Sequence, residues 1–396
     1  MSPQSLSSPE DQRVTFVELF FDLVFVFSVT QVVGFFDHGI SWGAAGQAVL
    51  VFWLVWWAWT QFTWALNAAD TTHQWVQFGT LLATAVALVM AVALPGAFGR
   101  DAMWFAVTYV LVRVIGLLLY YWVASENPSQ RAAIRTFAVV SIGGLAAVIL
   151  GALSGGSAQY AFWGFAILLD VIAAAVGAQS EDWNLHPEHF VERHGLFVII
   201  ALGETLIVTA GGVTGASWTG ELVAITLLVV AITCGLWWSY FTVAKPELDR
   251  ALASCTDATR AMMARDAFSL AHFPLICGVI AYAAAVEQAV THPMEPLGLA
   301  TRVALGAGIF LFIGGMAFAM WRATCGSPLG RTIAAAVTAV AVVAWAAAAP
   351  WLTLTLPLIG ILVIIVLEQP RGARNGVAIE GVGDRPIGGT SGQTQE

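Results

Sequence analysis

The sequence predicts an all-α, polytopic integral membrane protein of about twelve transmembrane helices with both ends in the cytoplasm. The first reason is composition. Of 396 residues, 59% are hydrophobic and only 10% are charged, whereas soluble domains are about 45–50% apolar and roughly 25% charged. The mean hydropathy of +0.80 agrees. The second reason is the length of the apolar runs, and the third is where the basic residues fall between them.

Each predicted helix is an apolar run of the length that crosses the hydrocarbon layer, about 20 residues. The last two runs are the weakest, because only the tripeptide APW separates them, and a re-entrant hairpin is the alternative for this pair. The twelve runs are 16–36, 46–66, 75–95, 104–123, 136–154, 160–178, 191–211, 220–241, 266–288, 301–321, 332–349 and 352–367.

The basic residues test this count, since cytoplasmic loops carry an excess of Lys and Arg. With the N-terminus inside, Arg100 and Arg302 fall outside, Arg113 lies within a span, and the other thirteen of the 16 fall on the cytoplasmic side. Removing one span would move the later basic residues to the opposite side of the membrane, and the cytoplasmic excess would be lost. The thirteen are Arg13, Arg131, Arg135, Arg193, Lys245, Arg250, Arg260, Arg265, Arg322, Arg331, Arg371, Arg374 and Arg385.

Short sequence matches connect the two halves of the membrane part, which we place at 14–180 and 181–368. The first and seventh runs open with Phe-Val-Glu at 16–18 and 190–192, and the second and eighth contain Trp-Trp pairs at 56–57 and 237–238. Two parallel six-helix repeats, an arrangement found in some transporters, would explain both matches. Chance is the alternative, because the motifs are short. The flanking segments, 1–13 and 369–396, are expected to be disordered.

Composition also limits the partners. A net charge of −9 argues against nucleic acid, which calls for a basic face. The four cysteines have no CxxC spacing, so neither a disulfide framework nor a zinc site is indicated, and no cofactor is predicted. The tryptophans are expected to mark the membrane interfaces, including the cluster WLVWWAW at 53–59, for which lining a cavity is the alternative.

Charged residues inside the apolar runs are the candidates for function, because a charge at mid-membrane costs at least about 2.5–3.5 kcal/mol on insertion scales. Glu18 and Asp22 lie one turn apart on one face of the first run, a pairing that suits reversible proton binding. Asp170 and Glu204 lie in the sixth and seventh runs. We take all four as candidate ion- or proton-binding residues. The alternative is a set of structural ion pairs, for example Arg113 with Asp170 or Glu204.

The segment HPEHFVERHG, residues 186–195, is the second polar cluster. Its spacing fits no standard zinc signature such as HExxH, and acids at a helix start complement the helix dipole, so no metal is predicted. Glu192 and Arg193 are expected to be partners of the Glu18 region across the repeat interface. Arg113 is expected to be a counter-charge, and His272, in the ninth run, a hydrogen-bonded core residue.

Two segments together, ELFFDLVFVFSVTQ (18–31) and HFVERHGLFVIIALGETLIV (189–208), resemble the bacterial low-temperature-requirement A family. The resemblance runs from about Arg13 to the end of the last span. It implies a multi-pass protein of the bacterial cytoplasmic membrane, in a family without an established biochemical activity. The signature positions that it implies are Glu18, Asp22, Gln31, His189, Glu192, Arg193, Gly203 and Glu204.

A looser similarity is to potassium channels built from two six-helix repeats, whose first helix carries Arg and then Phe-Ser-Asp. Here Arg13 precedes Phe21 and Asp22, but the Ser is absent and the spacing differs. The leading hypothesis is a secondary transporter of a cation or small polar solute, coupled to protons through the buried carboxylates. A passive cation channel is the runner-up, and a scaffold or sensor is a further alternative. An enzyme is not expected, because no Ser or Cys lies convincingly beside a His.

Overall fold

The described part of the chain is helical. The computed structural model describes residues 6–9, 12–126, 128–177, 183, 185–324, 326, 328–346 and 349–368. Within these ranges the only β pairing is an isolated bridge between Ser7 and Ala69. The tail expected to be disordered, 369–396, lies outside the described residues, as does part of 1–13. The described residues before the first helix contact the end of the second, where the Ser8 N–H donates to the carbonyl of Ala68.

The helices follow one another with short connections. Short 3₁₀ segments, η1 (Gly34–Phe36), η2 (Leu94–Gly96) and η3 (Ala124–Glu126), end three of them. The α-helices are α1 (Phe16–Val33), α2 (Trp42–Ala68), α3 (Gln74–Ala93), α4 (Ala102–Val123), α5 (Pro128–Ser154), α6 (Gly156–Gly177), α7 (Pro187–Val213), α8 (Gly220–Ser239), α9 (Lys245–Ser254), α10 (Asp257–Met263), α11 (His272–Thr291), α12 (Leu299–Thr324), α13 (Leu329–Ala344) and α14 (Pro350–Glu368).

Eleven helical segments of the described chain are long and apolar enough to cross a membrane. The protein is therefore a multi-pass membrane protein, and eleven of the twelve predicted runs are confirmed as helices of spanning length. The run 332–349 is the exception, because α13 has 16 residues. At 1.5 Å per residue it measures about 24 Å, less than the ~30 Å hydrocarbon layer. The orientation of the chain in the membrane stays a prediction.

Two of the spans are longer than a membrane requires. Helical structure is continuous over Gly220–Ser254 and over Thr259–Thr291, 35 and 33 residues. Each contains a π-helical segment, η4 (Tyr240–Ala244) and η5 (Ala264–Leu270). π-Helical turns inside α-helices are rare and frequently mark functional sites. Tyr240 of η4 is hydrogen-bonded to His272, which lies two residues after the end of η5.

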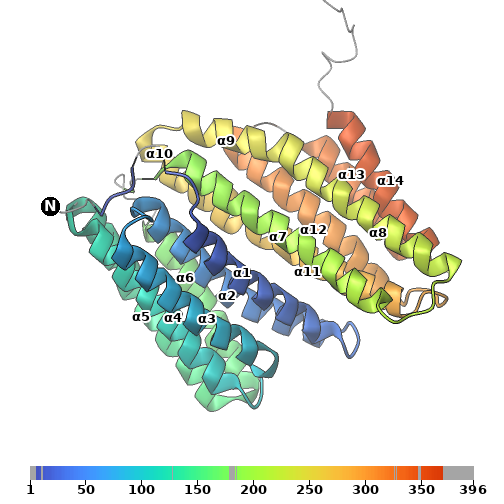
Figure 1. Ribbon diagram of the computed structural model, residues 1–396, viewed down its shortest axis with the longest axis horizontal. Helices are drawn as coiled ribbons and strands as arrows, with labels where there is room; N and C mark the ends of the chain where they lie inside the picture. Colours follow the sequence, from blue (N-terminus) through green and yellow to red (C-terminus); the bar gives the residue numbers. More distant parts are fainter. Residues whose placement is uncertain are drawn as a thin grey trace, which may run out of the picture.

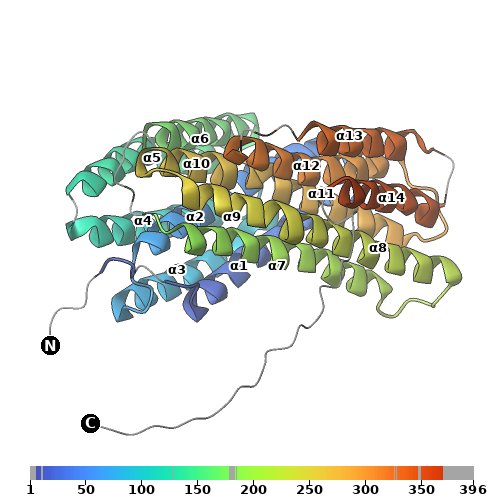
Figure 2. The same ribbon diagram turned by 90° about the horizontal axis from the view of Figure 1, so that it is seen from above.

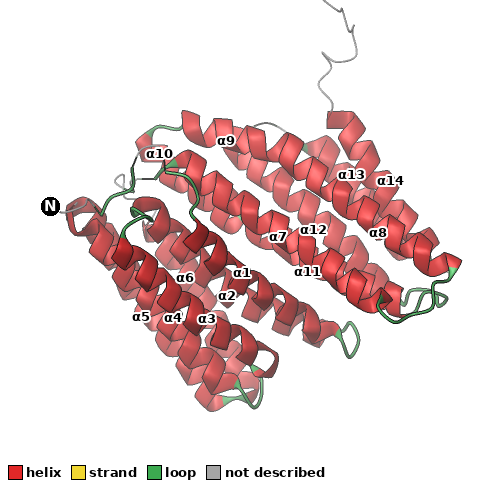
Figure 3. Ribbon diagram, in the orientation of Figure 1, coloured by secondary structure: helices red, strands yellow, loops and turns green. Residues whose placement is uncertain are grey.

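The helices form two groups that meet along α1, α2, α7 and α11. Figure 1 shows α1–α6 gathered on one side and α7–α14 on the other, and Figure 2 shows the same bundle from above. The loops lie at the two ends of the bundle (Figure 3). Between the groups, α1 contacts α7 and α11, and α2 contacts the same two helices. Residues on these four helices are therefore placed to respond to any movement of one group against the other.

Much of the order of packing is shared by the two groups, although α2 packs closely on α4 whereas α8 does not pack comparably on α12. In the first, α1 packs on α2 and α3, and then α3 on α4, α4 on α5 and α5 on α6. In the second, α7 packs on α8 and α11, and then α11 on α12, α12 on α13 and α13 on α14. This correspondence agrees with two six-helix units, but the duplication itself stays a prediction.

The tryptophan cluster of α2 lies in the core, so its expected position at a membrane interface is wrong. Trp56 and Trp59 are 1% and 0% exposed. The Trp56 indole N–H donates to the carbonyl of Ser269 on η5 at 2.7 Å, and Trp59 packs against Phe197 of α7, with 4.5 Å between ring centroids. These rings fill the contact between the two groups of helices, because they are large apolar surfaces that each carry one N–H donor.

Candidate functional site

Glu18 and Asp22 lie on the buried face of α1, where both side chains are 0% exposed. Thr15, directly before α1, forms a capping box with Glu18. The Thr15 backbone N–H and its hydroxyl both donate to Glu18 Oε2, each at 2.9 Å. The sequence Thr-x-x-Glu predicts such a cap. Unlike most caps, this one reaches into the protein interior, because α1 begins between α2 and α7.

Arg193 of α7 joins the two carboxylates. Its Nη1 donates to Glu18 Oε1 at 3.0 Å and its Nη2 to Asp22 Oδ1 at 2.5 Å. The guanidinium is also 0% exposed and lies over the Trp59 ring, 5.7 Å from its centroid. The Trp59 indole N–H donates to Asp22 Oδ1 at 2.7 Å. The expected pairing of Arg193 with the Glu18 region is thus present, and it connects the two groups of helices.

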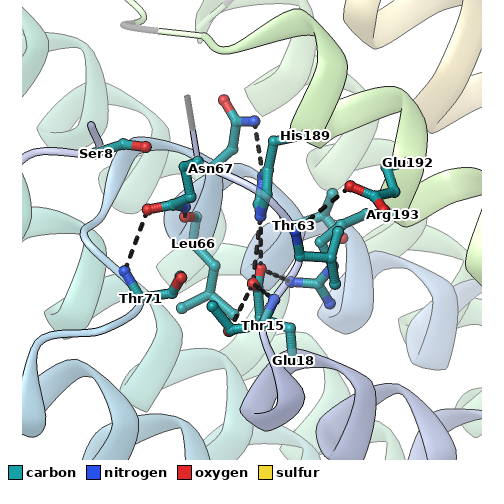
Figure 4. Close-up of polar contacts among 12 residues, drawn as sticks. Ser8, Thr15, Glu18, Thr63, Leu66, Asn67, Thr71, His189, Glu192 and Arg193 are labelled. Atoms are coloured by element: carbon teal, nitrogen blue, oxygen red, sulfur yellow. Dashed lines mark hydrogen bonds and ion pairs between the residues drawn. The ribbon is translucent and has the colours of Figure 1, made fainter. Parts of the chain in front are cut away.

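His189 completes the network from the α7 side (Figure 4). Its Nε2 lies 3.0 Å from Glu18 Oε1, and its Nδ1 lies 3.1 Å from Asn67 Nδ2 at the end of α2. The orientation of the Asn67 amide is determined by His186, whose backbone N–H donates to Asn67 Oδ1 at 2.8 Å and whose carbonyl accepts from Nδ2 at 2.9 Å. The Nδ2 atom is therefore the donor toward His189, and Nδ1 of His189 must accept. This leaves the proton on Nε2, which donates to Glu18.

The charge of the buried network follows from these hydrogen bonds. The bonded arrangement holds His189 in its neutral form, so Arg193 supplies one positive charge against the two carboxylates, Glu18 and Asp22. With both carboxylates ionised the set carries a net charge of −1. An uncompensated charge in a dry interior is costly. A single proton or a monovalent cation would balance the set.

Arg113 and Asp170 form a second, separate pair in the first group of helices. Arg113 of α4 donates to Asp170 of α6 through both Nη atoms at 3.2 Å, and its Nε donates to Gln61 Oε1 at 2.5 Å. The Tyr109 hydroxyl accepts a further bond at 2.6 Å. One arginine faces one aspartate here, so the pair is balanced. Structural ion pairs of Arg113 with Asp170 or Glu204 were the alternative to ion binding, and the structure has the pair with Asp170.

The other candidate residues lie apart from the network. His272 accepts from the Tyr240 hydroxyl through Nε2 at 2.8 Å and donates from Nδ1 to the Ala267 carbonyl at 3.1 Å, as expected of a core histidine. Glu204 is buried in the body of α7, where its Oε1 has no hydrogen-bond partner among the described residues. Gln31 is half-buried near the far end of α1.

A cleft of about 400 Å³ opens beside the network, at the starts of α1 and α7 and along α9. Glu192, the neighbour of Arg193, lines it and accepts a hydrogen bond from the Val14 backbone N–H at 3.4 Å. The cleft carries charges of both signs. Its lining residues are Gln12, Arg13, Glu188, Glu192, Gly195, Leu196, Ile199, Phe241, Lys245 and Asp249.

Comparison with known proteins identifies the family. The family model described as "Bacterial low temperature requirement A protein (LtrA)" matches residues 13–367. The chain belongs to the LtrA family. An uncharacterized protein from Rhizobium meliloti (strain 1021) is 30% identical to this LtrA protein over 324 residues, which cover 79% of this chain and 77% of that protein. No solved structure matches the chain.

Five of the eight positions that the resemblance implies as signature positions lie at or beside the network. Glu18 contacts His189 and Arg193, Arg193 also contacts Asp22, and Glu192 lies at the edge of the network. The other three, Gln31, Gly203 and Glu204, lie further along α1 and α7.

Two partners of the LtrA network were not expected from the sequence. Trp59 and Asn67 bind Asp22 and His189, and both come from α2. A polar Asn directly after the apolar run 46–66 is a signal for Asn67, but nothing in the sequence distinguishes Trp59 from its neighbours. The histidines of 186–195 do not form one site. His189 belongs to the network, whereas His194 donates to the Phe190 carbonyl. In the described part of the chain, no group of three or more His, Cys, Asp and Glu side chains is arranged to hold a metal ion.

Proposed function

We propose that this LtrA protein is a secondary transporter of the bacterial cytoplasmic membrane, which moves a cation or small polar solute coupled to protons, and that it is not an enzyme. One observation carries the proposal: two carboxylates and one guanidinium, all 0% exposed, meet between the two groups of helices. Ionisable residues within membrane spans are rare and mark ion and proton pathways.

The position of the network supports coupling. Glu18 and Asp22 belong to the first group of helices, and Arg193 and His189 to the second. Rocking of one group against the other is a common form of alternating access, with coupling sites at the interface between the units. A change of charge at Glu18 or Asp22 alters the attraction to Arg193 directly. Proton binding would therefore alter the free-energy difference between two arrangements of the groups.

In this proposal, water and ions approach the network through the cleft beside α7. Arg13, Glu192, Lys245 and Asp249 place charges of both signs along its walls. Such a lining admits water and ions up to Glu192, one residue from Arg193. Glu204, buried about three turns further along α7 than Arg193, is our candidate for a second polar position on the path. We assign the balanced pair of Arg113 and Asp170 to holding the first group of helices together.

The experiment is ion flux in proteoliposomes with a pH dye inside, under imposed sodium, potassium or pH gradients. Wild type is compared with Asp22→Asn and Glu18→Gln at equal incorporation, and Glu295→Gln, in an exposed loop, serves as the control. We expect proton movement in wild type and in the control, and its loss in both network variants.

The outcomes separate the candidate functions. Passive, electrogenic cation flux without proton coupling would indicate a channel and overturn the transporter. Proton-coupled flux that persists in both network variants would overturn the role of the carboxylates. If no gradient of ions or of a panel of small polar solutes produces flux in wild type, the transport proposal is wrong.

A further inference from the structure

We propose that the two carboxylates of the network have different tasks: Asp22 holds the exchangeable proton on its Oδ2 atom, while Glu18 stays ionised and positions Arg193. The inference rests on the proposed function, because it names the coupling ion as a proton and the atom that carries it. It is drawn from the hydrogen bonds of each carboxylate oxygen.

Both carboxylate oxygens of Glu18 are hydrogen-bonded, and four donors contact them. Glu18 Oε1 accepts from Arg193 Nη1 at 3.0 Å. His189 Nε2 lies 3.0 Å from Oε1 and donates to Oε2 at 3.3 Å. Glu18 Oε2 also accepts from the backbone N–H and the hydroxyl of Thr15, each at 2.9 Å. An ionised carboxylate offers about four lone-pair sites. Four donors therefore match this capacity, and the carboxylate form is the one that this site stabilises.

The hydrogen bonds of His189 also favour the ionised form of Glu18. The Asn67 amide donates to His189 Nδ1 and is itself held by both backbone groups of His186. His189 must therefore present Nε2–H to Glu18. A second proton on His189 would bring an N–H against the Asn67 amide N–H. Glu18, His189 and Asn67 thus form a connected set with a defined hydrogen-bond direction, running from α2 through α7 to α1.

Asp22 differs at one atom. Its Oδ1 accepts from Trp59 Nε1 at 2.7 Å and from Arg193 Nη2 at 2.5 Å, whereas its Oδ2 has no hydrogen-bond partner among the described residues. Asp22 is 0% exposed, so this oxygen is an unpartnered buried acceptor. Buried polar atoms of this kind are uncommon and call for an explanation.

A proton fits this oxygen better than a metal ion does. Adding H⁺ to Oδ2 forms one O–H bond and breaks none of the bonds at Oδ1, and it takes the charge of the network from −1 to 0. Metal cations prefer several oxygen ligands around them, and here the remaining carboxylate oxygens already accept from protein donors. The proton is supplied and removed by water on either side of the membrane.

The surroundings of Asp22 contain few other groups that titrate. On α1 there is Glu18, and α7 brings Arg193, His189 and His194. The helices α2 and α3 contribute no acidic, basic or histidine side chain within their bounds. His272 of α11 lies behind His194, with 5.3 Å between the ring centroids. Glu18 is therefore the one other acid among the groups named here.

Infrared spectroscopy of the full chain in lipid nanodiscs tests the assignment without relying on transport. A protonated carboxyl gives a C=O stretching band distinct from that of a carboxylate. In mildly acidic buffer we expect this band in wild type and in Asp170→Asn, and its loss in Asp22→Asn. In wild type, aspartate labelled with ¹³C at the carboxyl should shift the band, and labelled glutamate should leave it in place.

The isotope measurement keeps the test valid if the Asp22 variant fails to fold. A band that shifts with labelled glutamate, or that survives in folded Asp22→Asn, would show that Asp22 is not the proton carrier. This result is distinct from failure of the proposed function. Flux that is proton-coupled and sensitive to Asp22→Asn, with the band unchanged, would overturn only the assignment of Oδ2.

Discussion

The strongest energetic consequence of the network is the cost of removing Arg193. Arg193→Met keeps most of the side-chain volume but leaves Glu18 and Asp22 buried without a counter-charge. Removing one partner of a buried pair costs about 3–5 kcal/mol. Lost contact of the guanidinium with the Trp59 ring adds about 0.5–2 kcal/mol. We expect the free energy of unfolding to fall by at least about 3–5 kcal/mol.

Reversible unfolding in mixed micelles of detergent and dodecyl sulfate, followed by circular dichroism, measures this free energy. Arg100→Met is the control, because the Arg100 side chain is 90% exposed beside Asp101 and a surface pair contributes only about 0–1 kcal/mol. A second comparison uses Arg193→Met in a chain that already carries Glu18→Gln and Asp22→Asn. With no buried carboxylate left to balance, the cost should shrink by about 0.5–3 kcal/mol, the usual range for coupled residues.

Two results would refute the reasoning. One is a cost for Arg193→Met no larger than that for Arg100→Met, which would mean that the carboxylates are not charged or not buried in the folded protein. The other is an equal cost in the wild-type and the doubly neutralised background. Arg193 would then stabilise the fold through packing rather than through Glu18 and Asp22.

Three further predictions use the same unfolding measurement. Asn67→Ala leaves His189 Nδ1 and a backbone N–H unpaired, and we expect a cost of about 1–3 kcal/mol; no change would remove the basis for the histidine tautomer. Gly278→Ala places a Cβ 2.6 Å from two backbone atoms of α12 and should cost about 1–3 kcal/mol, whereas Gly203→Ala, with open space around it, should not destabilise. Asp170→Asn leaves the buried α4 arginine without its carboxylate, for an expected cost of about 3–5 kcal/mol; a cost near zero would contradict the buried pair.

The spans could be predicted because the bilayer imposes one strict rule. Backbone groups in hydrocarbon must be bonded internally, so long apolar runs become helices. The rule is weaker where a run is short, which is why the run 332–349 gave only the 16-residue α13. It also says nothing of how far a helix continues into water. The extensions to Ser254 and Thr259, and the π-helical segments within these helices, were not predicted for this reason.

The candidate site was predictable where sequence placed a charge in an apolar run. Glu18, Asp22 and Arg113 were found in this way. Arg193 was found because it directly follows the Phe-Val-Glu motif at 190–192, which matches 16–18 at the start of the first half. Partners that depend on packing were not. The tryptophans of α2 are alike in sequence, and only the approach of α1 and α7 decides that Trp59 reaches Asp22.

The distance along the chain between the partners of the network has a consequence for biosynthesis. Arg193 follows Glu18 by 175 residues and Asp22 by 171. Translation at about 5–20 residues per second separates their appearance by roughly 10–35 s. During that interval α1 enters the membrane with two acids whose partner has not been made. Two acids at a helix centre would cost about 5–7 kcal/mol on the insertion scale, and the cost here is smaller because both lie near the start of α1. Its many Phe, Leu and Val residues must offset this expense until α7 emerges from the ribosome.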